Sequence, residues 1–442
     1  MTLRGGSVMT AALTMPKTGT PKIVVLEPSC TTLRGHHFQA VLDLARAVHP
    51  AKPTVVVNAK MQSSLSFGDL TFHRLFQRGI YEPIYQAVLG ERPQQPIQRR
   101  WWQFKRSVLR MQQRSGLLQR PQAIWPEIPA VAERVSLLSA DHIVLPTANI
   151  DLILELVAYL RNHGGSQPQV HARILAFKGG RQGLKELDRL FEKLSSGAEP
   201  GDRVHLYVEM PAMQRFLSER YAVPVDLYPY LLNDPAKDRG RGGRSGKKPV
   251  TFGYLGYARA EKGFDRLLPI ISAVCANGSF EPHRVAFLVQ LDGPAKRVDP
   301  VRSGLKRLAS EHGVEIQLVE GVLSPETYSE LLEQINCVLL PYRNRYRFSG
   351  SGVLFEALLN AKPFICSSGL SFADYARAGN GIEASDDQAF AEAILKVAGT
   401  FELFGKAAQR AEDNYRASLA QMPLLQRLRT SRLAPAMVCP AA

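Results

Sequence analysis

Two short segments of the sequence combine glycines with charged residues in a way that suits phosphate binding. The first spans residues 253–265, with the sequence GYLGYARAEKGFD, and lies between a predicted strand and a predicted helix. Arg259 and Lys262 would there reach a diphosphate at the carboxyl edge of a sheet. Gly256 and Gly263 would let the backbone turn closely. A tight turn with two solvated cations would show the same residues, so this segment alone leaves both interpretations open.

The second segment is a Ser/Gly-rich loop that enters a helix, SGSGVLFEAL over residues 349–358. Free N–H groups and the positive end of the helix dipole would make the start of that helix an anion site. Glu356, in the first turns, would accept hydrogen bonds from ribose hydroxyls. In the alternative interpretation, Ser351 simply caps the helix and Glu356 complements its dipole. Two such segments in one half of the chain suit a nucleoside diphosphate better than either does alone.

The elements that would position these segments alternate between strand and helix in two series. The hydrophobic pattern predicts strands over 22–27, 53–57, 142–145, 170–177, 204–209 and 225–230, with helices over 38–48, 150–161, 183–194 and 213–221. A second series has strands over 250–255, 283–291, 316–320, 337–341 and 363–366, with helices over 263–276, 301–312, 325–334 and from 352. Residues 386–432 are predicted to be almost wholly helical. Two successive α/β series predict two Rossmann-like domains that face each other across a cleft.

A break in composition separates the two series. Residues 233–248 are rich in Gly, Lys and Arg and hold no large apolar side chain, which is typical of a linker. We therefore expect a disordered lead-in over 1–20, a first domain over 21–232, the linker, and a second domain over 249–400. The helices of 401–442 should pack back toward the first domain.

Composition narrows the class of protein. The 442 residues carry a formal net charge of +15, which favours anionic partners. The five cysteines are scattered without a CxxC pair, which argues against a disulfide framework or zinc site and for a reducing compartment. No apolar run is long enough to span a membrane, and the first 22 residues lack the apolar core of a signal peptide. We therefore expect a cytoplasmic protein.

The histidines are not expected to bind a metal. His36 and His37 are neighbours in a loop, so at most one of them faces the cleft, and no third ligand stands near them. His142, His171 and His205 fall at strand starts and are expected to be structural.

Four motifs of the second half resemble a known enzyme family. They are GYARAEKGFD from residue 256, GVLSPETY from 321, LLPY from 339 and SGSGVLFEALLNAKPFI from 349. In order and spacing they resemble the C-terminal half of the group 1 glycosyltransferases (family 4, GT-B fold) over residues 250–385. The N-terminal half is similar more loosely, through a first strand followed by Gly35-His36-His37 and through residues 204–229. The resemblance implies an acceptor domain first and a nucleotide-sugar donor domain second.

The resemblance also implies roles for individual residues. Arg259 and Lys262 would neutralise the donor diphosphate, and His36 would join them as a catalytic residue. Glu356 would hold the donor ribose. The remaining donor-binding residues implied are Gly35 and His36 near the sugar or acceptor, Gly256, Ser351, Gly352 and Val353 near phosphate, and Gly321, Val322 and Leu323 beside the nucleobase.

Two departures from the family pattern stand out. The family's first Glu, eight positions before Glu356, is Phe348 here, inside a Tyr/Arg-rich region. Tyr257 follows the strand-end glycine where the family usually has an Arg. The expected function remains transfer of a sugar from a nucleotide sugar to a saccharide or lipid-linked acceptor, with retention and without a metal or cofactor, in polysaccharide or glycoconjugate biosynthesis. A non-catalytic nucleotide-sugar-binding scaffold and a GT-B sugar-nucleotide epimerase are the alternatives.

A basic segment suggests a further partner. Between Glu91 and Glu127 the chain has no acidic residue and eight basic ones. Within it Trp101, Phe104, Val108 and Met111 form one helical stripe, with Arg106, Arg110 and Arg114 opposite. This pattern predicts that residues 98–120 bind anionic lipid at the inner face of the membrane. A helix packed into the core with a solvated basic face is the alternative, and nucleic acid is not expected as a partner.

Overall fold

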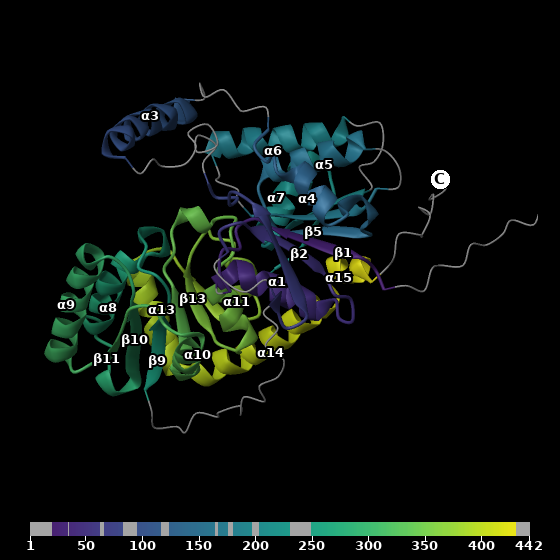
Figure 1. Ribbon diagram of the computed structural model, residues 1–442. Coiled ribbons are helices and arrows are strands. Elements are labelled where there is room, and N and C mark those ends of the chain that lie inside the picture. The colour runs from purple at the N-terminus through teal and green to yellow at the C-terminus, as the bar shows by residue number, and fades with distance from the viewer. Residues whose placement is uncertain are drawn as a thin grey trace, which may run out of the picture.

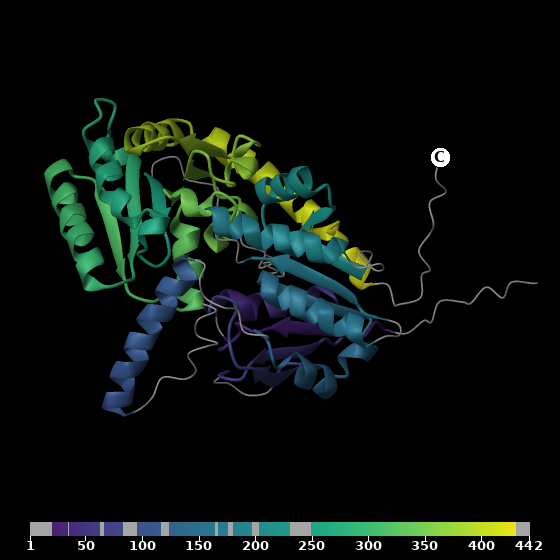
Figure 2. The same ribbon diagram turned by 90° about the horizontal axis from the view of Figure 1, so that it is seen from above.

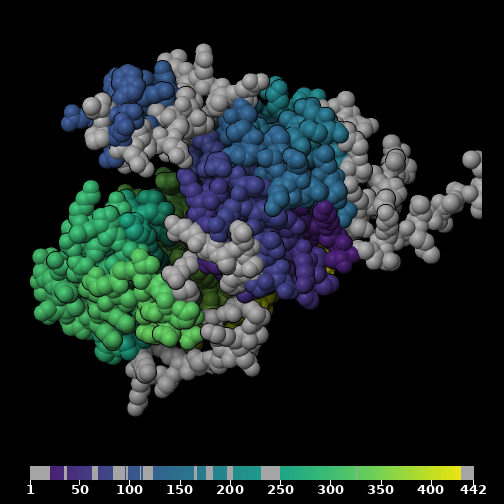
Figure 3. All heavy atoms as spheres, viewed as in Figure 1, coloured from purple at the N-terminus to yellow at the C-terminus, as the bar shows by residue number. Residues whose placement is uncertain are grey.

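The computed structural model describes residues 20–33, 35–61, 66–82, 95–115, 123–163, 167–175, 180–196, 203–229 and 249–429. The expected linker over 233–248, and the expected lead-in except for residue 20, lie outside these described residues. Two mostly parallel sheets, each covered by helices, form two lobes (Figures 1 and 3). The predicted α/β class is confirmed.

The first sheet has eight strands in the order β3-β4-β2-β1-β5-β6-β7-β8. Neighbouring strands pair in parallel, except for the antiparallel pair β3–β4. Runs such as IVVLE in β1 are buried on both faces, as expected of a parallel sheet covered by helices. The strands are β1 (Ile23–Glu27), β2 (Thr54–Asn58), β3 (Ser66–Phe67), β4 (Leu70–Phe76), β5 (His142–Ala148), β6 (Gln169–Ile174), β7 (Val204–Val208) and β8 (Val225–Leu227).

Helices cover both faces of this sheet. Alternate residues of β1 divide between two clusters: Val24 and Leu26 join the cluster of helices α4 (Ile128–Arg134), α5 (Ile150–Asn162) and α6 (Gly180–Ser195), whereas Ile23 and Val25 join that of α1 (Gly35–Ala47). Asn149 begins α5, because its side chain accepts a hydrogen bond from the Leu152 N–H. Helix α7 (Pro211–Tyr221) follows β7.

The second sheet has six parallel strands in the order β11-β10-β9-β12-β13-β14. One continuous core joins it to its helices. The strands are β9 (Val250–Tyr254), β10 (Val285–Leu291), β11 (Glu315–Glu320), β12 (Cys337–Leu340), β13 (Phe364–Ser367) and β14 (Gly381–Ala384). The helices are α8 (Leu267–Cys275), α9 (Ala295–His312), α10 (Pro325–Gln334), α11 (Gly352–Leu359), the short α12 (Ala373–Ala376) and α13 (Asp387–Gly399).

The last two described helices link the lobes. Helix α14 (Phe401–Ala420) runs from the second lobe toward α15 (Pro423–Leu428), which lies beside the first sheet (Figure 1). Leu424 and Leu428 are buried in the α1 side of the first core. Arg427 donates to the Asp226 carboxylate at 2.6 Å and to the Tyr207 hydroxyl at 2.8 Å. The end of the described chain is therefore anchored on the first lobe.

The same Tyr207 belongs to a buried chain of aromatic polar contacts. Its hydroxyl lies 3.0 Å from Nδ1 of His171, whose Nε2 lies 3.1 Å from Nδ1 of His142. His205 stacks on His171 at 4.9 Å between ring centroids. Burial and the two neighbouring histidines lower the pKa of His171 well below its usual value. These contacts agree with the structural role predicted for the three histidines.

Helix α3 (Pro96–Ser115) stands apart from both sheets in Figures 1 and 2. Its apolar stripe faces outward: Trp101, Phe104 and Met111 expose 67%, 59% and 64% of their surface. The interpretation of this stripe as a core-packed face is therefore wrong. Within the described part of the chain, no helix is both long enough and apolar enough to cross a membrane.

Candidate active site

The two predicted phosphate-binding segments lie at the carboxyl edge of the second sheet, where the loops after its parallel strands meet. The Gly256 N–H donates to Oε1 of Gln290 at 2.8 Å, and Nε2 of Gln290 donates to the Gly321 carbonyl at 2.9 Å. Gln290, near the end of β10, thereby ties the turn after β9 to the loop after β11. That loop carries Val322, which is 86% exposed, and the half-buried Leu323.

The basic turn after β9 brings Lys262 inward. Gly256 and Gly263 have φ values of +124° and +67°, which glycine adopts readily, and a Cβ on Gly256 would lie 3.0 Å from Nζ of Lys262. That ammonium also lies 5.5 Å from the ring centroid of Tyr342. Burial, followed by the nearby Arg259, lowers the pKa of Lys262. A partly desolvated cation of this kind would interact strongly with an anionic ligand.

Arg259 stays more open to solvent. Its side chain is 44% exposed and lies 3.8 Å from the Glu261 carboxylate. The two cations predicted to act as a pair therefore lie near each other but differ in exposure: Lys262 is largely buried and Arg259 stands at the surface.

The start of α11 is not capped by a side chain. Ser351 occupies the cap position, but its Oγ lies 3.3 Å from the Tyr342 hydroxyl rather than on the helix N–H groups. The interpretation of Ser351 as a side-chain cap is therefore wrong. Gly352 and Val353 form the first turn, so their N–H groups and the helix dipole stand at the positive end of α11. This arrangement is suited to an anion.

Glu356 lies one turn further along α11. One of its oxygens, Oε2, accepts a hydrogen bond from the Tyr328 hydroxyl of α10. Burial raises the pKa of Glu356, while the Tyr328 hydrogen bond and Lys262 oppose that rise. Tyr328 thus engages one of the two oxygens that we expected to hold a ribose.

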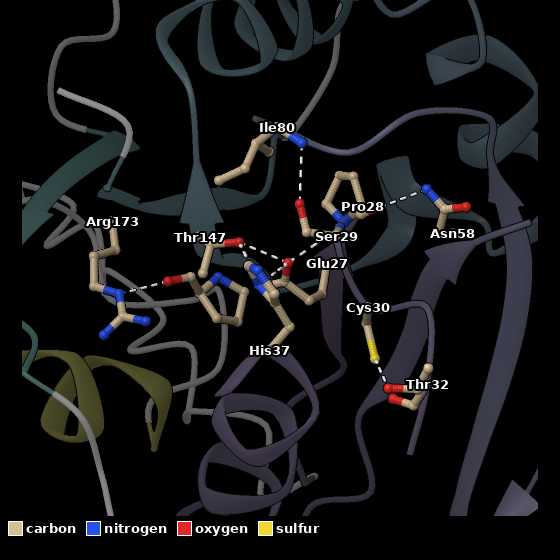
Figure 4. A network of polar contacts seen from close by, with 11 residues as sticks. Glu27, Pro28, Ser29, Cys30, Thr32, His37, Asn58, Ile80, Thr147 and Arg173 are labelled. Atoms are coloured by element: carbon tan, nitrogen blue, oxygen red, sulfur yellow. Dashed lines mark hydrogen bonds and ion pairs between the residues drawn. The ribbon is translucent and has the colours of Figure 1, made fainter. Parts of the chain in front are cut away.

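The facing edge of the first sheet carries a second polar cluster (Figure 4). Glu27, fully buried at the end of β1, accepts hydrogen bonds from the Thr147 hydroxyl at 2.6 and 2.7 Å. Its Oε1 lies 3.1 Å from Nδ1 of His37, whose side chain is 13% exposed. A buried carboxylate and a hydroxyl therefore fix the orientation of the His37 imidazole, an arrangement able to direct a ring nitrogen at a substrate hydroxyl.

The predicted site residues thus fall in three groups. Lys262, Ser351 and Glu356 lie around Tyr342, with Gly256 beside Lys262 and with Gly352 and Val353 in the first turn of α11. Arg259, Val322 and Leu323 belong to the surrounding loops. Gly35 and His36 begin α1, but their side chains lie outside the described residues, and His37 is the described histidine at this edge.

Sequence reasoning missed several members of the site. Tyr342 belongs to the LLPY motif and Tyr328 to the GVLSPETY motif, so the motifs contained both without showing their contacts. Glu27 is the last residue of the first predicted strand, and the structure shows that it is fully buried. Charged side chains are rarely buried without a partner, so a glutamate at the end of an apolar strand could have indicated a functional position. Among the described residues, no group of three or more His, Cys, Asp or Glu side chains could hold a metal ion.

Comparison with known families identifies the half that carries Lys262 and Glu356. Residues 249–399 match the family model described as glycosyl transferases group 1. Residues 249–399 of this chain form a group 1 glycosyltransferase domain. The resemblance seen in its motifs is confirmed, as is the expectation of a transferase enzyme. The search of curated proteins found no match to this chain.

Solved structures extend the likeness to both halves. A sucrose-phosphate synthase from Thermosynechococcus elongatus is 16% identical, with a TM-score of 0.57 over 92% of this chain and 98% of that one. A trehalose-phosphate synthase from Burkholderia xenovorans, described as UDP-forming and bound to glucose-6-phosphate, is 12% identical, with a TM-score of 0.58 over 92% and 100%. HepE from Anabaena, in complex with UDP-glucose, is 12% identical, with a TM-score of 0.51 over 92% and 97%. The glycosyltransferase domain thus sits in a chain with the predicted GT-B fold.

Proposed function

We propose that this enzyme transfers a sugar from a UDP-sugar to a saccharide or lipid-linked acceptor. The observation that carries the proposal is the gathering of Lys262, the start of α11 and Glu356 around Tyr342, with Gly256 beside Lys262, at one sheet edge of a group 1 glycosyltransferase domain. UDP is proposed because a UDP-forming synthase and a UDP-glucose complex share the fold.

The chemistry proposed is mainly electrostatic. The acceptor oxygen forms a bond to the anomeric carbon while the bond from that carbon to the diphosphate breaks, and the diphosphate keeps the electron pair. Lys262, Arg259 and the positive end of α11 stabilise the charge that develops, without a metal ion or other cofactor. By analogy with the family, the acceptor attacks the face that the diphosphate leaves, with retention, and its proton passes to the leaving phosphate.

The first half would hold the acceptor. The Glu27–His37–Thr147 cluster lies at the carboxyl edge of its sheet, where open α/β sheets bind ligands. An imidazole held by a buried carboxylate can fix one acceptor hydroxyl by hydrogen bonding. Saccharides and sugar phosphates both offer such hydroxyls, so either could serve as the acceptor in polysaccharide or glycoconjugate biosynthesis.

Calorimetry with UDP and UMP, followed by assays on a panel of UDP-sugars with EDTA present, tests the proposal. Binding of UDP that exceeds that of UMP, with sugar transfer and UDP release only when an acceptor is present, is the expected result. Binding of UDP without turnover of any donor would identify a scaffold instead. Interconversion of a UDP-sugar without an acceptor would identify an epimerase.

We propose in addition that α3 attaches the enzyme to an anionic membrane surface. Its outward aromatic stripe, with Trp101 stacked on Phe104 at 5.6 Å between centroids, is accompanied by the exposed cations Arg100 and Lys105. Aromatic side chains favour the headgroup region, and basic side chains favour anionic lipids. A lipid-linked acceptor would then approach the cleft from the membrane.

A further inference from the structure

Glu209 belongs to the first half of the chain but contacts the phosphate-binding loop of the second. It follows β7 and is 6% exposed. Its Oε2 accepts a hydrogen bond from the Gly350 N–H at 2.9 Å, across 141 positions of sequence. Gly350 stands two residues before Gly352, where α11 begins.

The fit between these two residues requires glycine at position 350. A Cβ added there would lie 2.8 Å from Oε2 of Glu209 and 2.8 Å from the ring of Phe355. Such distances are closer than real side-chain contacts, so any larger residue would push the loop away from Glu209. The backbone before α11 therefore lies directly against a carboxylate of the opposite half.

The same loop is held on its other side by its own half. The Ser371 hydroxyl lies within hydrogen-bond distance of the Ser349 carbonyl, at 3.1 Å, and of the Tyr346 carbonyl, at 3.2 Å. With Glu209 opposite, the loop is clamped between the two halves. Met210, next to Glu209, is fully buried in the core of the second half.

Glu209 also contacts Arg173, which lies near the Glu27–His37–Thr147 cluster of the first half (Figure 4). Its Oε1 lies 4.0 Å from Nη1 of Arg173, a guanidinium that is 1% exposed. Arg173 donates from Nε to the carbonyl of Pro146, and Pro146 precedes the Thr147 that holds Glu27. Consecutive contacts thus run from the Glu27–His37 cluster to the start of α11.

The charge of this carboxylate acts on tyrosines of both halves. Glu209 contributes to raising the pKa values of Tyr81 in the first half and of Tyr375 and Tyr415 in the second, after burial as the largest cause. The carboxylate therefore lies close to the boundary between the lobes. Glu209 therefore has contacts with both halves, through Arg173 in the first and Gly350 in the second.

We propose that Glu209 is a positioning residue that sets the phosphate-binding start of α11 from the acceptor half. The UDP site would then be fully formed only when the two halves are joined through Glu209 and Gly350. This inference deepens the proposed function and rests on it for the identity of the anion. The contacts described above connect the two halves through Glu209. Measurements on variants test whether this connection changes the affinity for UDP.

The test combines UDP calorimetry with backbone amide exchange of residues 348–353, measured by mass spectrometry. Glu209→Ala should speed exchange in this segment and weaken UDP binding by about tenfold, the effect of losing one hydrogen bond to a charged group. Glu209→Gln retains an acceptor oxygen for the Gly350 N–H and should stay within about threefold of the parent. Gly350→Ala keeps Glu209 but displaces the loop, so it should change amide exchange and UDP affinity as Glu209→Ala does. It replaces Glu209→Ala in the test if that variant does not fold.

Arg215→Ala is the matched control. Arg215 of α7 pairs with Asp374 at 2.9 Å, so its loss also weakens the contact between the lobes but leaves the loop untouched. Equal loss of UDP affinity in Arg215→Ala and Glu209→Ala would overturn the proposal, because general loosening would explain both. Unchanged amide exchange in Glu209→Ala and Gly350→Ala would also overturn it. A parent that does not bind UDP refutes the proposed donor, and the exchange measurement still decides the positioning role.

Discussion

The ring of Phe348 packs on the ring of Phe216 with their centroids 5.0 Å apart. Phe216 belongs to α7 of the first half, and both rings pack against the first core although Phe348 lies in the loop before α11. Phe348 stands where the family pattern places a glutamate. At this position an apolar contact between the halves therefore replaces the charged residue of the family pattern. It lies in the same loop as Gly350, which donates its N–H to Glu209.

Replacing Phe348 with glutamate should lower the stability of the protein, although it introduces the residue that the family pattern has at this position. The substitution loses an aromatic pair worth about 0.5–1.5 kcal/mol and places a carboxylate in a half-buried apolar contact. We expect a loss of about 2 kcal/mol in the free energy of unfolding, measured by urea denaturation. Phe348→Leu, which keeps an apolar side chain, should lose about half as much. A glutamate variant as stable as the parent would show that the contact with Phe216 contributes little.

Lys262→Ala should weaken UDP binding more than Arg259→Ala does. Each change removes a contact between a cation and the diphosphate, worth about 1.5–3 kcal/mol for a charged hydrogen bond. Lys262 should lie near the upper end because it is enclosed beside Tyr342, whereas Arg259 is exposed and screened by water. Calorimetry with UDP measures both effects.

Arg284→Ala is the control for this pair of variants. Arg284 lies before β10, on the same half, and pairs with the Glu281 carboxylate at 3.6 Å. Its loss removes one positive charge from the domain without touching the carboxyl edge of the sheet. If Lys262→Ala and Arg284→Ala bind UDP equally well, the diphosphate lies elsewhere.

UDP affinity should fall as the pH rises, and it should do so earlier than an ordinary lysine would allow. Burial lowers the pKa of Lys262, so its ammonium loses a proton at a lower pH than a solvated lysine. The cationic form binds the diphosphate, so the contribution of Lys262 is present below that lowered pKa and is lost above it. Lys262→Arg, which stays protonated, should flatten the pH profile measured by calorimetry. An identical decline in both proteins would assign the pH effect to another group.

Glu356→Gln should impair UDP binding more than it affects stability. An amide offers one acceptor oxygen and adds a donor, so it cannot serve both the Tyr328 hydroxyl and a ribose. Tyr328→Phe separates the two tasks, because it frees the carboxylate oxygen and removes a contact that lowers the pKa of Glu356. That variant should bind UDP at neutral pH but lose affinity sooner on acidification. Unchanged UDP affinity in Glu356→Gln would contradict the ribose assignment.

Much of the fold could be predicted from local patterns, and the differences have local causes. Short β-branched runs such as TVVVN identified the central strands. Strand β4 was missed because LTFHRLF mixes polar residues into its apolar pattern, and the edge strand β14 because GIEA is short. Helix α9 begins at Ala295, six residues earlier than predicted, and it contains Pro300, a residue type that usually interrupts a helix.

The site was predictable only where its residues share a motif. Lys262 and Glu356 were found because glycines and charges stand at strand ends. The hydrogen bond from Tyr328 to Glu356 and that from Gly350 to Glu209 join distant positions, and nothing in a single sequence specifies such pairs. His37 was passed over for its neighbour because spacing alone cannot tell which of two adjacent side chains meets Glu27.

Membrane attachment through α3 is tested by flotation with liposomes that contain or lack anionic lipid. The parent should float with anionic vesicles at physiological salt and should be released at high salt, because the Debye length shortens from about 8 Å to about 3 Å at 1 M. Each basic residue near the surface contributes about 1 kcal/mol, so the double variant Arg100→Glu/Lys105→Glu should abolish flotation. Trp101→Ala/Phe104→Ala should weaken it by removing the exposed aromatic pair.

A matched control separates local attachment from the overall positive charge. Lys306→Glu/Arg307→Glu changes the net charge by the same amount on α9, where both side chains are exposed. This variant should float like the parent, because α9 lacks an outward aromatic stripe comparable with that of α3 among the described residues. Equal loss in both double variants would mean that net charge alone holds the protein on the vesicles. A parent that never floats would refute attachment of α3 to anionic lipid, and the acceptor would then not need to be membrane-bound.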